Sequence, residues 1–553
     1  MSGARLIGGI GALAAALSLA DGVAAQPSEG HHKPRSSAHQ AAGPGRPLPQ
    51  LVGKDGHFAL MVDGAPYLML GAQVNNSSAW PAMLPKVWPA IDKLHANTVE
   101  VPIAWEQVEA REGQFDFSFL DTLLAQAREH HVRLVLLWFG AWKNNGPNYA
   151  PEWVKLDNAR FPRVITARGE TMNSLSPAYP AILAADRTAF SAFMTHLKGA
   201  DPQRTVIMVQ VENETGVYGA IRDHSAAAEQ QFQGAVPDAL VKALNKQPGT
   251  WTQVFGPDAD EFFYAWLSAH YVDEMAAAGK AIYPLPMYVN AALRDPVNYQ
   301  DPMSYSSGGP TWNALNIWKA AAPSIDLVAP DIYMRDYANY VRTLSQYSRP
   351  DNALMVPETG NDLIYAHMFF EVVGRRSLGF SPFGMDYTGY ANFPLGAPKI
   401  DEAAIEVFAQ NYRLVAPFAR QLAALSYQGK VWGASEPPDV HEQRIDLGGW
   451  QVDATYGRPQ FGTPPATGNP TPSGGFLVAE LGPGEYLVTG YHVRLNFELT
   501  DRSGRKPLFV RVEEGHYVDG QWVFDRLWNG DQTDYGLNFT SEPQVLHVRL
   551  ATY

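Results

Sequence analysis

Two apolar segments of the sequence lead into glutamates that could work as a pair. Val206–Val211 runs into Glu214, and Leu354–Val356 runs into Glu358. Two carboxyl groups can hydrolyse a glycosidic bond when one protonates the departing oxygen and the other attacks the anomeric carbon. A separation of about 5–5.5 Å retains the anomeric configuration, and about 6.5–9.5 Å inverts it. An ionised Glu358 would help to raise the pKa of its neighbour and keep that neighbour protonated.

The elements that must position this pair form a repeating pattern. Short runs rich in Val, Leu and Ile, each followed by a longer helical pattern, are typical of parallel strands covered on both faces. Eight such runs predict an α/β fold, a (β/α)8 TIM barrel, whose active site would lie at the carboxyl ends of the strands. A doubly wound sheet is the alternative, but no Gly-rich phosphate loop opens any of these units. The runs are Leu68–Ala72, Thr98–Ile103, Arg133–Trp138, Val206–Val211, Leu285–Val289, Ile325–Ala329, Leu354–Val356 and Leu378–Ser381.

In such a barrel the fourth and seventh strands face each other across the mouth, so a glutamate that follows the fourth strand, Glu212 or Glu214, is predicted to pair with Glu358. Alternation along a strand puts Glu212 and Glu214 on the same side, so spacing alone does not choose between them. Tyr333 could orient Glu358 or contact a sugar. Polar and aromatic residues at other strand ends are further candidates for lining the pocket, namely Trp138, Lys143, Asn144 and Asp331.

Two segments resemble glycoside hydrolase family 35, the β-galactosidases. The residues from Val209 to Gly216 read Val-Gln-Val-Glu-Asn-Glu-Thr-Gly, and the family carries Gln-(Ile/Val)-Glu-Asn-Glu-Tyr-Gly there. The segment from Trp105 to Phe117 resembles the family's Trp-x-x-x-Glu-x-x-x-Gly-x-(Tyr/Phe)-x-Phe stretch. The resemblance extends roughly from Leu51 to Ala424.

By position, the resemblance implies that Glu214 is the acid/base and Glu358 the nucleophile. It also implies that Asn213 hydrogen-bonds the sugar's 2-hydroxyl, and that no cofactor is needed. The sequence departs from the family at Thr215, where Tyr is usual, and at Lys143-Asn144-Asn145, where the family has Cys-Ala-Glu. These departures favour a divergent branch.

The resemblance therefore predicts a retaining, exo-acting β-galactosidase that removes terminal β-galactose from oligosaccharides or polysaccharides. Some bacterial relatives with an appended β-domain act on galactose-bearing xyloglucan side chains. One alternative is another retaining β-glycosidase, such as a β-glucosidase, arabinosidase or endo-glucanase. A second alternative is a non-catalytic carbohydrate-binding protein. No spacing typical of a metal site occurs in the sequence.

The first 25 residues have the pattern of a secretory signal peptide. Arg5 precedes an Ala/Leu-rich apolar run, and Val23-Ala24-Ala25 forms a small-residue cleavage site. Residues 26–49 are rich in Pro, Gly, Ser and His and predict a flexible leader. Export without any Cys favours the periplasm, with no integral membrane segment after signal cleavage. A formal net charge of −14 disfavours a nucleic-acid partner.

After the predicted barrel, residues 50–424, the pattern changes to short β-rich runs separated by Gly, Pro, Asn and Asp. Residues 425–553 therefore predict a C-terminal β-sandwich domain. Such a domain could bind polysaccharide or brace the barrel, and bracing is the favoured interpretation.

Overall fold

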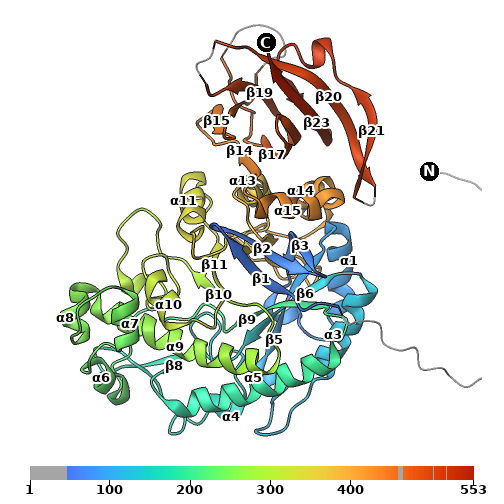
Figure 1. Cartoon of the computed structure of the whole chain (residues 1–553). Helices are drawn as coiled ribbons and strands as arrows, with labels where there is room; N and C mark the ends of the chain where they lie inside the picture. The colour runs from blue at the N-terminus through green and yellow to red at the C-terminus, as the bar shows by residue number, and fades with distance from the viewer. Residues whose placement is uncertain (1–45, 459–464, 502–503, 519) are drawn as a thin grey trace, which may run out of the picture. The chain divides into compact units, whose positions relative to one another are not determined.

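The computed structural model describes residues 46–458, 465–501, 504–518 and 520–553. The predicted signal peptide and residues 26–45 of the predicted leader lie outside these residues. Eight parallel strands close into a barrel in the order β10-β11-β12-β13-β4-β5-β6-β9 (Figure 1), which confirms the predicted fold class. The strands are β4 (Met69–Gln73), β5 (Thr98–Ala104), β6 (Arg133–Phe139), β9 (Val206–Val211), β10 (Met287–Ala292), β11 (Leu327–Ile332), β12 (Val356–Thr359) and β13 (Gly379–Pro382).

Each of the eight predicted runs overlaps a barrel strand, but several strands start later than the apolar run and continue past it. The run at Ile325–Ala329 corresponds to β11, which starts at Leu327 and ends at Ile332. The run at Leu354–Val356 leads into β12, which starts at Val356. The difference arises because polar residues near the carboxyl ends still pair in the sheet. As a result Asp331 lies inside β11 and Glu358 inside β12, where they are register partners on adjacent strands.

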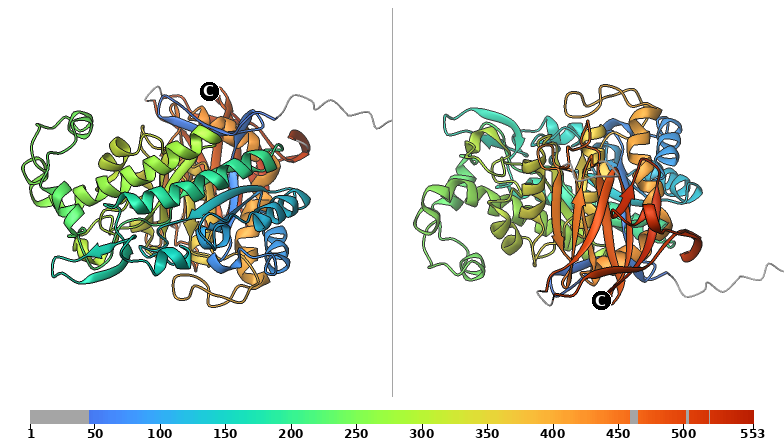
Figure 2. Two further views of the ribbon diagram at one scale, coloured as in Figure 1. Left: turned by 90° about the horizontal axis from the view of Figure 1, so that it is seen from below. Right: turned by 90° about the horizontal axis from the view of Figure 1, so that it is seen from above.

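Helices cover the barrel, and the two longest pack against each other. Figure 2 (left) shows α5 (Pro180–Ala200) alongside α9 (Ala259–Ile282). A Cβ added at Gly279 of α9 would lie 2.5 Å from the Phe190 ring, so glycine permits this close approach. The other longer helices are α1 (Leu84–Leu94), α3 (Ser118–Glu129), α11 (Tyr337–Tyr347), α14 (Glu402–Val415) and α15 (Ala419–Tyr427). Shorter helices are α2 (Trp105–Val108), α4 (Glu152–Lys155), α6 (Ala226–Phe232), α7 (Asp238–Ala243), α8 (Trp251–Phe255), α10 (Leu315–Ala321), α12 (Leu363–His367) and α13 (Phe369–Gly374).

A three-stranded antiparallel sheet precedes the barrel. It consists of β1 (Gln50–Lys54), β2 (His57–Val62) and β3 (Ala65–Tyr67). Asp63 and Gly64 connect β2 to β3 with φ of 55° and 79°, the backbone that a tight hairpin turn requires. A further hairpin, β7 (Arg163–Ile165) with β8 (Thr171–Leu175), lies between β6 and α5. None of the described helices combines the length and apolarity needed to cross a bilayer.

The C-terminal part is a sandwich of two antiparallel sheets, ordered β14-β17-β18-β23-β20-β21 and β15-β16-β19-β22, with a shared apolar core. The segment from Glu485 to Leu499 divides between the two sheets, because His492, with φ 47°, turns the chain between β18 and β19. The strands are β14 (Val431–Ser435), β15 (Glu442–Asp446), β16 (Trp450–Thr455), β17 (Gly475–Gly482), β18 (Glu485–Tyr491), β19 (Val493–Leu499), β20 (Pro507–Val518), β21 (Gln521–Leu527), β22 (Leu537–Phe539) and β23 (Gln544–Thr552).

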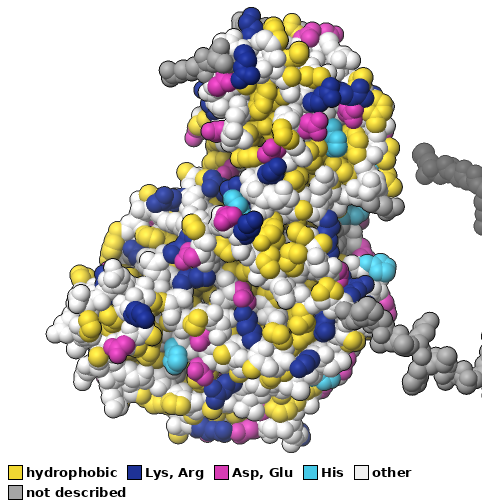
Figure 3. Space-filling model, in the orientation of Figure 1, with side chains coloured by type: hydrophobic (Ala, Val, Ile, Leu, Met, Phe, Trp, Pro, Cys, Tyr) yellow, Lys and Arg dark blue, Asp and Glu magenta, His cyan; other side chains and the backbone are white. Residues whose placement is uncertain are grey.

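The sandwich contacts the barrel through β14. The backbone amide and hydroxyl of Ser435 hydrogen-bond Glu371 of α13 and the His367 carbonyl. The surface of the molecule mixes charges of both signs with apolar side chains, and β20 and β21 carry several exposed apolar residues (Figure 3). The bracing role of this domain stays a prediction.

Candidate active site

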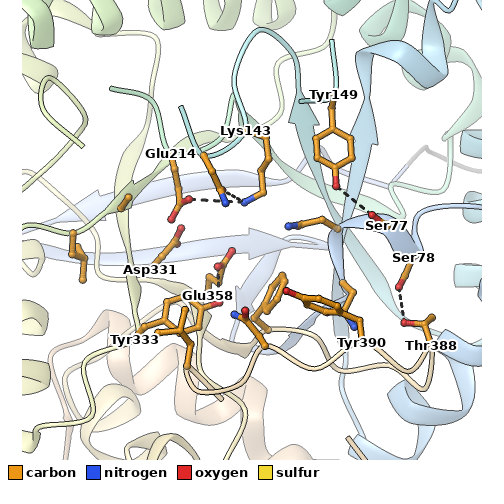
Figure 4. A pocket seen from close by; sticks show the side chains of 18 of the residues that line it. Ser77, Ser78, Lys143, Tyr149, Glu214, Asp331, Tyr333, Glu358, Thr388 and Tyr390 are labelled. Atoms are coloured by element: carbon orange, nitrogen blue, oxygen red, sulfur yellow. Dashed lines mark hydrogen bonds and ion pairs between the residues drawn. The ribbon is translucent and has the colours of Figure 1, made fainter. Parts of the chain in front are cut away.

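A pocket of about 860 Å³ contains both predicted catalytic glutamates. Figure 4 shows Glu214, Asp331 and Glu358 facing the same space, with Lys143 beside Glu214. The pocket is lined by Asn75, Asn76, Ser77, Ser78, Met83, Lys143, Asn144, Tyr149, Glu214, Tyr218, Ala292, Leu293, Asp331, Tyr333, Met334, Glu358, Phe383, Thr388, Tyr390, Asn392 and Leu395. This set contains the carboxyl ends of strands on opposite sides of the barrel, as expected for an active site on this fold.

Three carboxyl groups form the centre of the pocket. One oxygen of each of Glu214, Asp331 and Glu358 lies within 4.8 Å of the others. Oxygens at this spacing could hold a metal ion, but the Lys143 ammonium already lies 3.9 Å from Glu214 Oε2 and supplies positive charge. We therefore interpret the cluster as acid–base and nucleophilic groups.

Glu358 is held by hydrogen bonds to both of its oxygens. The Tyr333 hydroxyl donates to Oε1 at 2.7 Å, and Gln73 Nε2 donates to Oε2 at 2.9 Å. Burial and the nearby Glu358 raise the pKa of Tyr333 well above its usual value, so the phenol remains a donor. Two donors from β4 and from the end of β11 thus fix the carboxylate in one orientation, as a nucleophile requires.

Glu214 is positioned through its backbone. Its N–H donates to Asn290 Oδ1 at 2.9 Å, and its carbonyl accepts from Asn145 Nδ2 at 2.7 Å. Burial raises the pKa of the Glu214 carboxyl, Lys143 acts in the opposite direction, and Glu358 raises it further. The result is a carboxyl that keeps its proton to higher pH than an ordinary glutamate, as a general acid requires.

Asp331 is the third carboxyl and is only 3% exposed. Asn290 Nδ2 donates to its Oδ2 at 2.6 Å, whereas Oδ1 has no hydrogen-bond partner among the described residues. Burial, followed by Glu358 and Glu214, raises the pKa of Asp331 well above its usual value. The group therefore holds a proton readily and offers hydrogen-bonding capacity to a ligand.

Other residues from the sequence prediction divide into two groups. Tyr333, Lys143 and Asn144 line the pocket, with the Lys143 ammonium donating to Asn144 Oδ1. Trp138 and Asn213 do not line the pocket and are fully buried.

The prediction that Trp138 lines the pocket is wrong, because its side chain points into the helix layer. Its ring packs on Phe190 and Phe193 of α5, and its Nε1 donates to Asp186. The Asn213 amide has no hydrogen-bond partner among the described residues. The side chain does not reach the pocket as placed, so its expected contact with a sugar hydroxyl stays a prediction.

The structure also separates Glu212 from Glu214. Both have positive φ, 62° and 45°, so the chain is no longer an extended strand and the expected alternation fails. Glu214 lines the pocket, while Glu212 is fully buried and accepts from the Trp142 amide. The resemblance therefore selected the glutamate that faces the pocket.

Two positioning residues, Gln73 and Asn290, were missed from the sequence. Each is a polar residue near the carboxyl end of an otherwise apolar barrel strand, β4 and β10. That position was the available signal, because parallel strand ends converge on the active site.

Comparisons with known family models give one match over part of the barrel and one over the C-terminal part. Residues 80–277 match the model of glycoside hydrolase family 42, β-galactosidase. Residues 408–540 match a domain family of unknown function, DUF5597. None of the curated proteins matches the chain.

Similar solved structures include two β-galactosidases. The enzyme from the psychrophilic Marinomonas ef1 is 13% identical with a TM-score of 0.46, over 64% of this chain and 61% of that one. The cold-adapted enzyme from Rahnella sp. R3 is 15% identical with a TM-score of 0.43, over 66% of this chain and 57% of that one. The chain thus spans about three fifths of the length of these enzymes.

The family match corrects the predicted family. Family 35 is not supported, because the model that matches is that of family 42. The matched residues include Glu214 and Lys143 but end before Glu358. The prediction of a glycoside hydrolase is confirmed at this level: residues 80–277, about a third of the chain, are similar to the family 42 model, β-galactosidase.

Proposed function

We propose that this protein is a retaining, exo-acting β-galactosidase that removes terminal β-galactose from oligosaccharides. One observation carries the proposal: oxygens of Glu214 and Glu358 approach within 4.8 Å of each other in a pocket. This spacing suits direct attack by one carboxylate, and an inverting enzyme would need about 6.5–9.5 Å to admit a water.

The first step forms a covalent intermediate. Glu358 attacks the anomeric carbon, the glycosidic C–O bond breaks, and Glu214 gives its proton to the departing oxygen. In the second step Glu214, now a carboxylate, takes a proton from water, and the resulting hydroxide displaces Glu358. The Tyr333 and Gln73 donors hold Glu358 for both steps.

Two buried polar oxygens could recognise hydroxyls of the bound sugar. Asn75 Oδ1 and Asp331 Oδ1 have no hydrogen-bond partner among the described residues, and both residues line the pocket. Asn75 is fixed by Asp386, which accepts from its N–H at 2.8 Å and from its Nδ2 at 3.0 Å. Unpaired buried groups of this kind discriminate strongly between sugars that satisfy them and sugars that do not.

The rim suggests how the rest of a substrate binds. Tyr390 is 60% exposed and Tyr218 is 44% exposed, and both line the pocket. Their faces could stack on sugars beyond the terminal residue, so the proposed substrates are galactose-terminated oligosaccharides, including those derived from xyloglucan. Export to the periplasm through the predicted signal peptide would bring the enzyme to such substrates.

Hydrolysis of nitrophenyl glycosides tests the proposal. Wild type would be compared on β-galactoside, β-glucoside, α-arabinoside and β-mannoside, with product configuration followed by NMR. We expect β-galactoside to be fastest and β-galactose to appear first. A faster rate on another sugar would leave a retaining glycosidase but remove the galactose assignment. Binding of galactosides without any turnover would favour the non-catalytic alternative.

A further inference from the structure

A second pair of carboxyl groups lies behind the turn that carries Glu214. Asp186 of α5 and Glu212, directly after β9, are both 0% exposed. Their carboxyl groups lie close together, because Glu212 Oε1 and Asp186 Oδ1 are 2.5 Å and 2.7 Å from the same point, the position of a Cβ built on Gly140. Neither residue lines the pocket, so the proposed reaction does not use them directly. Two fully buried carboxylates in contact would be costly if both were ionised.

The donors around the pair show where the negative charge resides. Asp186 accepts three hydrogen bonds, from Trp138 Nε1 at 2.9 Å, the Ala141 amide at 3.2 Å and the Tyr271 hydroxyl at 2.8 Å. Such a set of donors stabilises a carboxylate.

Glu212 has a different environment. Its Oε2 accepts from the Trp142 amide at 2.9 Å, and its Oε1 receives no hydrogen bond from the described residues. Oε1 is therefore free to carry a proton and donate it to Asp186.

The groups that face the pair support a single shared proton. Burial raises the pKa of both acids, and the negative charge of Asp186 raises that of Glu212 further. From α9 the facing titratable group is Tyr271, whose own pKa burial and the two acids raise well above its usual value. From β6 and the loop after it, the groups are the neutral Trp138 indole and backbone amides, while Lys143 points to Glu214.

We propose that Asp186 and Glu212 share one proton and act as a positioning pair that fixes the Glu214 turn against the loop carrying Lys143. One member of the pair, Glu212, is only two residues before Glu214 in the same turn. The pair also holds the amides of Ala141 and Trp142, and the next residue is Lys143. The acid/base and the cation 3.9 Å from it are thereby placed by one buried unit.

Two local features fit this function. A Cβ at Gly140 would lie 2.5 Å from Glu212 Oε1 and 2.7 Å from Asp186 Oδ1, so the loop touches the pair where only glycine fits. The left-handed φ of Glu212 and of Glu214 is unfavourable for these residue types and needs surrounding contacts to persist. The pair provides contacts of this kind.

The inference rests on the proposed function for its activity measurement, and a stability measurement tests it independently. Glu212→Gln is the matched variant, since its amide can donate to Asp186 and its carbonyl can accept from Trp142. Asp186→Asn is the mismatched variant, since its NH2 group would face the hydrogen-bond donors that now point at the Asp186 carboxylate. Glu212→Ala removes the link. For each, melting temperature would be measured from pH 4 to pH 9, and kcat and KM with a β-galactoside.

We expect Glu212→Gln to keep kcat within about threefold of wild type, because the introduced amide closely copies a glutamate that carries the shared proton. Asp186→Asn and Glu212→Ala should lower kcat by roughly 5- to 150-fold, the range for leaving a buried group unpaired, with KM nearly unchanged. Equal kcat losses for Glu212→Gln and Glu212→Ala, or no loss in Asp186→Asn and Glu212→Ala, would overturn the proposal.

The pH dependence has a definite sign. The folded wild type retains a proton that the unfolded chain releases above about pH 4.3, so its unfolding equilibrium constant rises up to tenfold per pH unit until the pair ionises. Glu212→Gln lacks this dependence. Its melting temperature should match wild type near pH 4 and exceed it increasingly at higher pH. Parallel curves would refute the shared proton even if the protein hydrolysed no glycoside at all.

Discussion

Glu212 and Glu214 are separated by a single residue, yet the structure gives them opposite surroundings. Glu214 faces a pocket with Lys143 at 3.9 Å and two further carboxyl groups within 4.8 Å. Glu212 is fully buried next to Asp186 behind the same turn, and it accepts a hydrogen bond from the Trp142 amide. Both acids have a raised pKa, with burial as the main cause. A raised pKa therefore does not identify a catalytic acid; access to the pocket does.

The largest effect should come from replacing Glu358, because the proposed reaction then has no nucleophile. Glu358→Gly should lower kcat on the order of 10⁴- to 10⁶-fold. Added azide should restore turnover of an aryl β-galactoside and yield α-galactosyl azide, which NMR would identify. The control is Glu402→Gln, an exposed glutamate at the start of α14, which should be unaffected. The role of Glu358 would be contradicted if azide restored no turnover and the residual product of Glu358→Gly kept the same anomeric configuration as the wild-type product.

Glu214→Gln should be the next most damaging change. Loss of the general acid should lower kcat roughly 10²- to 10⁴-fold for a sugar leaving group. Substrates with an acidic phenol leaving group should suffer much less, because their departure needs no proton. The comparison with Glu212→Gln is direct, since the same substitution two residues away should be tolerated. Equal losses on both kinds of leaving group would argue against the acid role.

Replacing Lys143 should change the pH profile more than the maximal rate. The ammonium favours the ionised form of Glu214, so Lys143→Met should raise the Glu214 pKa. The acid then stays protonated to higher pH, so the basic limb of the pH profile of kcat/KM should shift to higher pH. Lys155→Met is the matched control, since that lysine pairs with Glu106. A basic limb that stays in place would show that Lys143 does not act on the acid.

Trp138→Phe should have the smallest effect on substrate binding. The change removes the Nε1 donor to buried Asp186, which should lower the free energy of unfolding by about 1–3 kcal/mol. KM should stay within about twofold of wild type, because the ring does not line the pocket. Denaturant unfolding and steady-state kinetics measure the two quantities. A large rise in KM with an unchanged free energy of unfolding would indicate that Trp138 contacts the substrate.

The contrast between Trp138 and Glu358 also shows what the sequence could and could not predict. Apolar runs located all eight barrel strands, and the carboxyl end of the seventh strand correctly placed Glu358 in the pocket. Successive residues of a strand alternate between the barrel interior and the helix layer, and the runs did not reveal which way each residue points. Trp138 points to the helix layer, where Phe190 and Phe193 cover it.

The partners of the catalytic residues were harder to predict than the residues themselves. Gln73 meets Glu358 across 285 positions of sequence, and Asn290 joins Glu214 to Asp331 only after the barrel closes. The buried Asp186–Glu212 pair joins a helix residue to a strand end in the same way. Such contacts depend on strand register and helix packing, which periodicity does not specify.

Trapping the covalent intermediate tests the central claim most directly. Wild type would be incubated with 2-deoxy-2-fluoro-β-galactosyl fluoride, whose fluorine slows both steps while the activated leaving group lets the first proceed. The digested protein would then be analysed by mass spectrometry. The account predicts one fluorogalactosyl group on the peptide that contains Glu358, and none after Glu358→Gln. A label on Glu214, or an active enzyme that forms no adduct and releases α-galactose first, would contradict it.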